Sequence, residues 1–429
     1  MATLLNAYKT CRKAAEIRFD LPSTSSDGGL LLLKKADHLL GLTSGFASCL
    51  KDPRKGNREH TIQKMLSQRV YAICQGWEDC NDFDTLKEDA LYAQVLEGSP
   101  ASQPTLSRFE NWFGRRELYG LSVALANSFI DRHRGSSPRK IVIDMDATDD
   151  PTHGQQEFEF FHGYYDCHCF LPLLVFCSAD GGDQELAGAI LRPGNSHAGR
   201  SSAAILDRLV QLLKAAFPKA EIVFRADAGF ALAEIYGVCE RLGISYLISL
   251  PRNTRLEVLA FPLIQDARTL RAQTGSKVRL FGEFSYAAGT WPDERRVIVK
   301  AEIMDKGENP RFVVTNLPDD PQTLYEDYCK RGDCENRIKE LKIDLDSGRT
   351  SCHKFTANCF RLLLHAIAFV LMSQVRRMLA GTGLARSTMG QIRLHILKIA
   401  AQVQVSTRRV LIRLPSEHPN ADILERLLE

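Results

Sequence analysis

Residues 141–151 read IVIDMDATDDP, and this stretch decides the fold because a strongly apolar run ends abruptly in acid. Three consecutive β-branched residues are typical of a buried central strand. Asp144 and Asp146 are two positions apart, so they share one face of that strand. Clustered carboxylates repel one another unless a cation or protons lie between them. The cluster therefore predicts a site at the end of a strand, and a solvated acidic turn with capping aspartates is the alternative.

A second apolar strand ends in the same way. Residues 221–225 lead into Asp227 within the stretch RADAGF, where Ala228 and Gly229 permit a tight turn. Asp227 is thus a second acid at a strand end. The alternative is that its side chain caps the helix that follows near Ala231.

The third acid lies in a helical segment, YCKRGDCENRIKELK at residues 328–342. If this segment is one helix, Tyr328, Arg331, Glu335 and Lys342 fall within an arc of about 60°, and Lys339 borders it. One helix face then carries an aromatic ring, a carboxylate and several cations. The alternative is a solvent-exposed face with salt bridges.

Hydrolysis of a phosphodiester would use such a set of side chains. Two Mg²⁺ ions about 3.5–4 Å apart can activate the nucleophile and stabilise the leaving oxygen. Mg²⁺ takes oxygen ligands, which favours carboxylates over cysteine or histidine. Neighbouring Arg and Lys side chains can hold DNA phosphates, and a tyrosine can stack on a displaced base.

Composition excludes few functions. The chain has 429 residues and a net charge of only +3, so any nucleic-acid contact must come from locally concentrated basic residues. Its 12 cysteines are scattered, which favours free thiols in a reducing cytosol. Cys167, His168 and Cys169 lack the spacing of a zinc site, and buried cysteine is the plainer interpretation. We expect no secretory signal and no membrane span.

The hydrophobic pattern predicts four regions. Residues 1–135 are expected to form a helical N-terminal DNA-binding domain, which ends at a basic Gly-Ser-Ser-Pro linker. Strands alternate with helices in residues 136–250 and 319–375, which predicts an α/β catalytic core. Residues 251–318 are predicted to be a β-rich insertion. Residues 376–429 form a basic C-terminal region.

Basic residues gather in two places. Between Val375 and Leu414 there are eight Lys or Arg residues and no acid: Arg376, Arg377, Arg386, Arg393, Lys398, Arg408, Arg409 and Arg413. In the N-terminal region, Arg54, Lys55, Arg58, Lys64 and Arg69 could contact the DNA backbone. The alternative for the C-terminal group is a solvated basic face. No helix-turn-helix can be identified, so base-reading residues stay unassigned.

The sequence resembles the DDE transposases of bacterial insertion sequences, in the group with a Tyr-x2-Arg-x3-Glu-x6-Lys signature. Tyr328, Arg331, Glu335 and Lys342 fit this signature without a gap. The likeness is greatest to the insertion-sequence thirteen-eighty family. It rests on SQPTLSRFEN (102–111), IDMDATDDPTHGQQ (143–156), RADAGF (225–230) and ENRIKELK (335–342), within a region of about 28–419.

The resemblance implies a ribonuclease-H-like core. Its first aspartate lies on the first strand, its second follows the fourth strand, and its glutamate lies on a later helix. Asp146, Asp227 and Glu335 would then be the catalytic, metal-binding acids. Asp146 is chosen over Asp144 because the family's Asp-x-Thr pattern matches residues 146–148, and Asp144 stays in reserve. Trp291 could hold a flipped base, as an aromatic does in related enzymes, or could simply pack on the insertion.

The resemblance also implies an activity. Such an enzyme cuts double-stranded DNA at terminal inverted repeats and joins the 3′-ends to target DNA, using two Mg²⁺ ions for which Mn²⁺ can substitute. It is expected to form a homodimer when synapsed on DNA, in the bacterial cytoplasm with the nucleoid. A DNA-binding protein without catalysis, a nuclease that cuts without joining, and an assembly protein are the alternatives.

Overall fold

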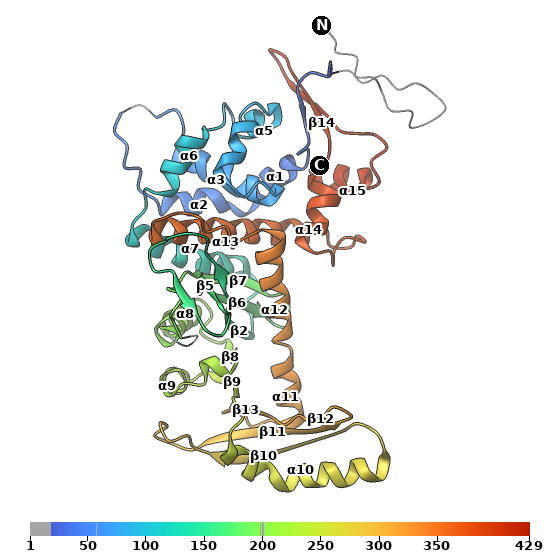
Figure 1. The fold of residues 1–429 in the computed structure, drawn as a ribbon. Coiled ribbons are helices and arrows are strands. Elements are labelled where there is room, and N and C mark those ends of the chain that lie inside the picture. The colour runs from blue at the N-terminus through green and yellow to red at the C-terminus, as the bar shows by residue number, and fades with distance from the viewer. Residues whose placement is uncertain (1–18, 57, 198, 200) are drawn as a thin grey trace. The chain divides into compact units, whose positions relative to one another are not determined.

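A computed structural model describes residues 19–56, 58–197, 199 and 201–429 (Figure 1). The chain divides into two compact units. The terminal unit comprises Met1–Ala47, Asp52–Phe109 and Leu371–Glu429, and the central unit comprises Ser48–Lys51 and Glu110–Val370. Residues 1–18 of the predicted N-terminal domain lie outside the described residues.

The central unit is built on a nine-stranded sheet with the order β10-β11-β13-β9-β8-β2-β6-β7, in which β12 pairs with β11. The strands are β2 (Lys140–Ala147), β6 (Leu173–Ala179), β7 (Glu185–Ile190), β8 (Glu221–Ala226), β9 (Ser245–Leu250), β10 (Val278–Tyr286), β11 (Arg295–Met304), β12 (Gly307–Glu308) and β13 (Arg311–Thr315). Strand β6 runs antiparallel to β2 and to β7, whereas β8 runs parallel to β2 and to β9.

This sheet makes the central unit a mixed α/β structure. Its first strand in the chain, β2, lies in the interior between β6 and β8. The second and third strands continue on one side of β2 and the fourth and fifth on the other. Asp146 lies near the end of the first strand and Asp227 directly after the fourth, as the ribonuclease-H-like resemblance predicts.

Helices cover both faces of the sheet. The central-unit helices are α7 (Arg115–His133), α8 (Ser202–Ala216), α9 (Ala233–Arg241), α10 (Thr254–Thr274), α11 (Pro321–Cys329), α12 (Gly332–Lys339) and the larger part of α13 (Phe355–Met378). Residues Ile141, Ile143 and Met145 of β2 join helices α7, α8 and α9 in the main hydrophobic core. The intervening residues of β2 point to the opposite face, which therefore receives Asp144 and Asp146.

Residues 251–318 contain long strands, as predicted for a β-rich insertion, but they also hold a helix that the prediction lacked. They begin with a helix of 21 residues, α10, and their strands continue the core sheet beyond β9. The Asn253 side chain accepts a hydrogen bond from the Leu256 N–H at the start of the helix, and Gly275 closes it with a φ of 66°. Pro262 inside the helix hid this element, because proline usually ends a helix.

The prediction of one continuous helix over residues 328–342 is wrong. Helix α11 ends at Cys329, and the Arg331 N–H donates to the Tyr328 carbonyl in a tight turn before α12 begins. A π-helical turn, Glu340–Asp344, then follows α12. Both irregularities rotate side chains away from their positions on an ideal helical wheel. The neighbours of each side chain therefore follow from its contacts in the structure and not from its spacing in the sequence.

The terminal unit is largely helical, and it combines both ends of the described chain. Its elements are β1 (Thr24–Ser25), α1 (Leu30–Leu40), α2 (Leu42–Ser48), α3 (Ile62–Gln75), α4 (Phe83–Leu86), α5 (Ala90–Val95), α6 (Gln103–Glu110), α14 (Met389–Ile392), β14 (Ala401–Val405), β15 (Val410–Arg413) and α15 (Ala421–Leu428). Strand β1 pairs with β14, and the Lys398 ammonium donates to Asp27 at 2.7 Å. Helix α3 is capped by Thr61 at its start and by Gly76 at its end.

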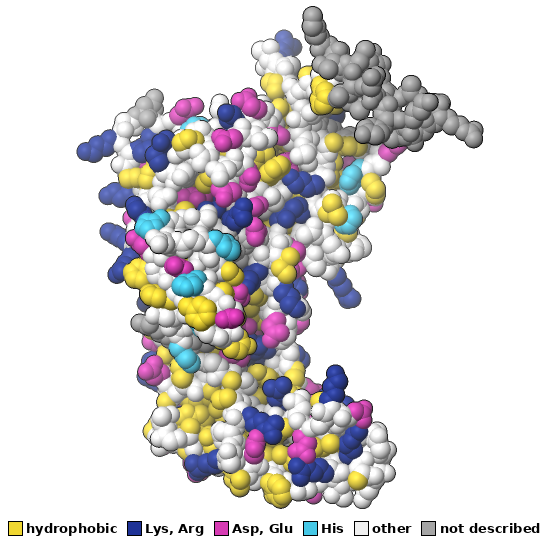
Figure 2. All heavy atoms as spheres, viewed as in Figure 1, with side chains coloured by type: hydrophobic (Ala, Val, Ile, Leu, Met, Phe, Trp, Pro, Cys, Tyr) yellow, Lys and Arg dark blue, Asp and Glu magenta, His cyan; other side chains and the backbone are white. Residues whose placement is uncertain are grey.

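A small three-stranded sheet follows β2 in the central unit. It consists of β3 (Asp150–Pro151), β4 (Phe160–His162) and β5 (Cys167–Phe170) in the order β3-β5-β4. Phe160, Phe161 and Tyr164 are exposed there. Figure 2 shows histidine and hydrophobic side chains gathered where Figure 1 labels β5 and α8.

Helix α13 is long and apolar enough to cross a membrane by length and composition, the one such helix among the described residues. Most of its apolar window is buried within the protein, as in the core helix of a folded domain.

Candidate active site

Asp144, the reserve candidate, is fully occupied by an ion pair. The guanidinium of Arg225 donates from Nε and Nη2 to the two carboxylate oxygens, at 2.9 and 2.6 Å. Arg225 is the register partner of Asp144 on the parallel strand β8, and both side chains are buried. Arg225 also donates to the backbone carbonyl of Asp327 at 2.7 Å. This two-pronged pair ties β2 to β8 and α11, which is a structural role.

Asp146 lies in a different environment, although it is only two residues further along β2. Its residue is 9% exposed. One carboxylate oxygen accepts from the Ala147 N–H at 2.9 Å, and the other accepts from Nη2 of Arg331 at 2.6 Å. Burial raises the pKa of Asp146 to about 6, against the effect of Arg331, and the neighbouring charges of Asp227 and Glu335 raise it further. The charges of the other two predicted acids are thus felt at Asp146.

Asp227 reaches the same level through the parallel pairing of β8 with β2. Met145 pairs with Ala226, so Asp146 and Asp227 are the next residues along neighbouring strands, which lie about 4.8 Å apart. The Asp227 side chain accepts a hydrogen bond from the Gly229 N–H at 2.9 Å and caps a short 3-10 turn. Both interpretations of Asp227 are therefore compatible, because a capping carboxylate still lies beside Asp146.

Glu335 approaches from α12. Its side chain is more than half exposed, and one oxygen accepts from Nη1 of Arg331 at 2.9 Å. Arg331 therefore holds Asp146 with one nitrogen and Glu335 with another. Burial acts to lower the pKa of Arg331, but Asp146 and Asp227 more than offset this, and the net shift is upward.

A buried guanidinium thus lies where three carboxylates need a positive charge. Among the described residues, no three His, Cys, Asp or Glu side chains lie close enough together to hold a metal ion. The donor chemistry of the three acids suits a hard cation such as Mg²⁺.

The whole described site and nearly the whole chain match one protein family. The family model for the transposase DDE domain, group 1, matches residues 9–429. The chain belongs to this DDE transposase family.

Comparison with solved structures adds little to the family assignment. The structure described as "Mos1 transposase paired-end complex with left transposon end" shares 15% identity, with 48% of this chain and 62% of that chain covered and a TM-score of 0.18. The structure described as "Crystal structure of a pre-cleavage Mos1 transpososome" shares 11% identity, with 48% and 63% covered and a TM-score of 0.17. No curated protein matches the chain.

The remaining signature residues of this DDE transposase chain surround the acids. Tyr328 is half-buried and hydrogen-bonded to Ser249, and burial raises the pKa of its hydroxyl. Lys342 lies in the π-helical turn, where its ammonium contacts the Asp149 carboxylate at 2.8 Å and the Thr148 hydroxyl at 3.2 Å. Lys339 is exposed at the end of α12.

Trp291 is placed away from these residues. It is 9% exposed and belongs to the main hydrophobic core. Its ring meets those of Tyr236 and Tyr286 at centroid distances of 4.9 and 5.6 Å, and Arg295 lies over it at 5.4 Å. This geometry corresponds to the packing alternative, because a base could stack on the ring only if it left the core.

Sequence reasoning did not assign roles to three residues that help to build the site. Arg225 was visible in RADAGF, two positions before Asp227, and strand register would have placed it beside Asp144. Asp149 anchors Lys342 and was visible in the first acidic cluster. Tyr165 gave no signal. Burial raises its pKa to about 12, helped by the nearby charges of Asp149 and Asp146.

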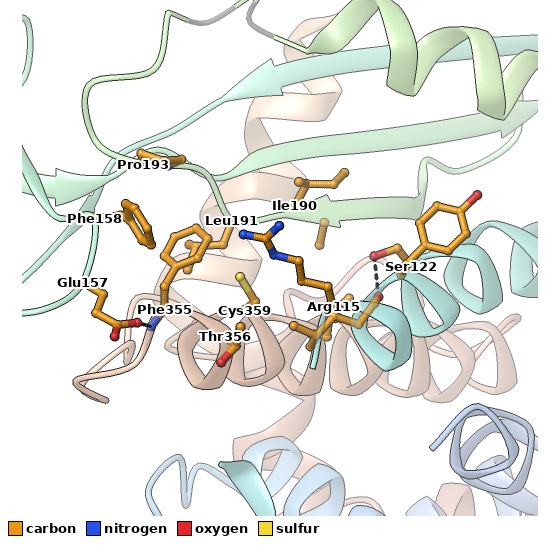
Figure 3. A pocket seen from close by; sticks show the side chains of 14 residues that line it. Arg115, Ser122, Glu157, Phe158, Ile190, Leu191, Pro193, Phe355, Thr356 and Cys359 are labelled. Atoms are coloured by element: carbon orange, nitrogen blue, oxygen red, sulfur yellow. Dashed lines mark hydrogen bonds between the residues drawn. The ribbon is translucent and has the colours of Figure 1, made fainter. Parts of the chain in front are cut away.

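A separate, mainly apolar cavity of about 550 Å³ lies at the edge strand β7 (Figure 3). Side chains from α7, β7 and the start of α13 surround it, and Arg115 is its one cation among the described lining residues. Phe158 and Phe355 meet edge to face at 5.3 Å on one side. None of the predicted site residues lines this cavity.

Proposed function

We propose that this protein is a DNA transposase that cuts at the terminal inverted repeats of an insertion sequence and joins the ends to target DNA. One observation carries the proposal. Asp146 on β2 and Glu335 on α12 share one buried guanidinium, and Asp227, directly after β8, lies next to Asp146 on the neighbouring strand. Membership of the DDE transposase family supports a transposase enzyme. Cutting and joining can both use one such site, since each is an attack on a phosphodiester.

The acids Asp146, Asp227 and Glu335 would hold divalent metal. Two Mg²⁺ ions, or Mn²⁺ in their place, would supply activation of the attacking oxygen and stabilisation of the leaving oxygen. Their ligands would be carboxylates, in keeping with the preference of these ions for oxygen. Arg331 serves as the counter-charge before loading, and a guanidinium displaced from the acids is well suited to bind a DNA phosphate.

The other signature residues contribute to DNA binding in this proposal. Lys342 is held by Asp149 at the rim of the site, and Lys339 is exposed beside it, so both can meet phosphates. Tyr328 offers a half-buried ring close to Asp227 and Arg331. Trp291 has a structural role instead, because its ring is packed into the core.

The proposed partners are the two transposon ends and the target duplex. A homodimer would hold the two ends together in the bacterial cytoplasm, in association with the nucleoid. Of the eight basic residues between 375 and 414, the four exposed ones supply cations for phosphate contacts: Arg386, Arg408, Arg409 and Arg413.

The test is cleavage of labelled DNA that carries the element's own terminal repeat, in Mg²⁺ or Mn²⁺. Wild type is expected to nick at the repeat boundary, whereas Glu335→Gln binds the DNA and does not cut it. Glu326→Gln is a matched control, because it makes the same change on the exposed surface of the preceding helix, α11. Strand-transfer products from a marked end would establish joining. Binding without cutting under either metal would contradict the proposal.

A further inference from the structure

The outer half of the hairpin formed by β14 and β15 is exposed to solvent (β14 in Figure 1). At its inner end, Ala401 and Val403 are buried, and β1 pairs with the start of β14. At its outer end, Val405 pairs with Val410, and their side chains are 63% and 44% exposed. The turn residues 406–409 are all exposed. The hairpin is therefore anchored at one end and open to solvent at the other.

The turn of this hairpin is held by one serine. The Ser406 N–H and hydroxyl each donate to the Arg409 carbonyl at 2.9 Å, and the hydroxyl accepts from the Arg409 N–H at 3.2 Å. The guanidinium groups of Arg408 and Arg409 have no partner among the described residues. Residues 401–414 contain no acid. The tip thus presents two uncompensated cations on a well-held backbone.

One face of the hairpin carries side chains that donate and accept hydrogen bonds. Paired residues of neighbouring strands point to the same face, and successive residues alternate between faces. Gln402 pairs with Arg413, and Gln404 pairs with Leu411, so the polar side chains share the face opposite the buried Val403. Gln404 and Arg413 are exposed, and their side chains have no partner among the described residues. An amide and a guanidinium on this face are therefore available to a ligand.

The edges of DNA base pairs offer the matching groups. The major groove is about 12 Å wide and admits a two-stranded β-ribbon. In it, glutamine can bind N6 and N7 of adenine, and arginine can bind O6 and N7 of guanine. Gln404 and Arg413 lie diagonally across the ladder, about 7–8 Å apart. This separation corresponds to about two base-pair steps of roughly 3.4 Å.

We propose that the β14–β15 hairpin reads the terminal repeat from the major groove, with Gln404 and Arg413 on base edges and Arg408 and Arg409 on the flanking phosphates. This inference rests on the proposed function, which supplies the DNA but assigns no base-reading residue. It moves Arg413 from the phosphate contacts to the base contacts. The tip residues then set affinity for any sequence, whereas the polar face sets the choice of sequence.

The first test compares two labelled duplexes by fluorescence anisotropy with the full chain in EDTA. One carries the element's own terminal repeat, and the other is a scrambled duplex of the same composition. Wild type is expected to prefer the repeat, and Gln404→Met and Arg413→Met are each expected to lower that preference about 5- to 150-fold. Gln273→Met, at an exposed glutamine of α10, is expected to leave it unchanged.

A wild type that binds both duplexes equally overturns the proposal. So do Gln404→Met and Arg413→Met variants that fold, by circular dichroism, and keep the wild-type preference. Because no metal is present, the result is independent of cutting. A protein that reads the repeat but does not cut contradicts the proposed function alone, and one that cuts without using this face contradicts this inference alone.

The tip arginines provide a matched control for the loss of charge at Arg413. Arg408→Met and Arg409→Met are expected to weaken binding to both duplexes equally. Each should lower the slope of the logarithm of affinity against the logarithm of salt concentration by about 1. An unchanged slope, or a loss confined to the repeat duplex, overturns the assignment of the tip to phosphates.

The groove itself is tested with modified bases. A 7-deazapurine lacks the N7 acceptor of the major groove, and 3-deazaadenine lacks the N3 acceptor of the minor groove. Single 7-deazapurine substitutions along the repeat are expected to weaken wild type at two positions about two base pairs apart. Gln404→Met should be insensitive to one of these substitutions, and Arg413→Met to the other. Sensitivity to 3-deazaadenine alone overturns the major-groove placement.

Discussion

Asp144 and Asp146 lie two residues apart on the same face of one strand, yet their carboxylates bind different arginines. Asp144 is held by Arg225, its register partner on the neighbouring strand, and both oxygens are used. Asp146 is held by Arg331, which comes from a turn between two helices and also binds the exposed Glu335. The two arginines differ in where they lie: Arg225 is on a strand of the sheet, whereas Arg331 is in a turn. The Asp144–Arg225 ion pair therefore holds the sheet together, and the Asp146–Arg331 ion pair can rearrange during a reaction.

The largest expected difference is in catalysis. Asp146→Asn is expected to lower DNA cleavage at least 1,000-fold, because it removes a charged metal ligand. The free energy of unfolding should change less than for loss of Asp144, since the Asn side chain still offers Arg331 an acceptor and Glu335 remains as a charged partner. Single-turnover cleavage and urea unfolding measure the two effects. A variant that unfolds easily, or one that still cuts, would show that Asp146 resembles Asp144 after all.

The second difference is in stability. Asp144→Ala leaves the Arg225 guanidinium buried without its carboxylate, and loss of one partner of a buried pair typically costs about 3–5 kcal/mol. Urea unfolding at pH 7 measures this cost. The double variant Asp144→Ala, Arg225→Met should recover much of the loss, because no unpaired charge remains. Equal stability of Asp144→Ala and wild type would contradict a structural role.

The third prediction concerns the competition between Arg331 and metal. Arg331→Gln removes the cation that contacts Asp146 and Glu335, so Mn²⁺ should bind the free protein about 3 to 10 times more tightly. Cleavage should still fall, because a phosphate-binding cation is lost. Calorimetric titration with Mn²⁺ measures the affinity, and Arg337→Gln on the same helix is the control. Weaker Mn²⁺ binding by Arg331→Gln would mean that the arginine supports the metal site rather than occupying it.

The smallest expected effect concerns a third acid of the same segment, Asp150. Its side chain is buried and accepts a hydrogen bond from Thr350 at 2.8 Å. Burial raises its pKa to about 7. A carboxyl whose pKa is higher in the folded state stabilises the fold only while protonated, so stability falls as pH rises from about 4 to 7.

Asp150→Asn keeps a neutral acceptor for Thr350 and removes this ionisation. Its gain over wild type should therefore be about 1–3 kcal/mol larger at pH 8 than at pH 5. Urea unfolding at the two pH values measures the gain. Asp131→Asn, at an exposed position on α7, should show no such dependence. An equal effect of Asp150→Asn at both pH values would mean that the carboxyl is already ionised at pH 5.

Strand ends were the most predictable part of the site. A β-branched run before Asp146 and an apolar run before Asp227 predicted both strands, because such runs are typical of strands buried on both faces. Parallel pairing of β2 with β8 then brings the two acids to one level. Periodicity cannot reveal which strands pair, so the role of Arg225 opposite Asp144 became visible only in the sheet.

Irregular backbone was the least predictable part. The helical wheel assumed a regular helix over residues 328–342, but a tight turn at Arg331 and a π-helical turn at 340–344 interrupt it. The tight turn aims Arg331 at two acids, and the π-helical turn carries Lys342 to Asp149. Pro262 likewise concealed α10, although the caps Asn253 and Gly275 were readable. Local signals show where elements begin and end more reliably than whether they stay regular.

The terminal unit has a consequence for the timing of synthesis. Its first two segments end at Phe109, and its last segment begins about 260 residues later, at Leu371. At roughly 5–20 residues per second, the ribosome needs about 13 to 50 seconds to reach the start of this last segment. Throughout this delay β1 lacks its partner β14, and Asp27 lacks Lys398. The core of this unit therefore stays unfinished until synthesis of the chain is almost complete.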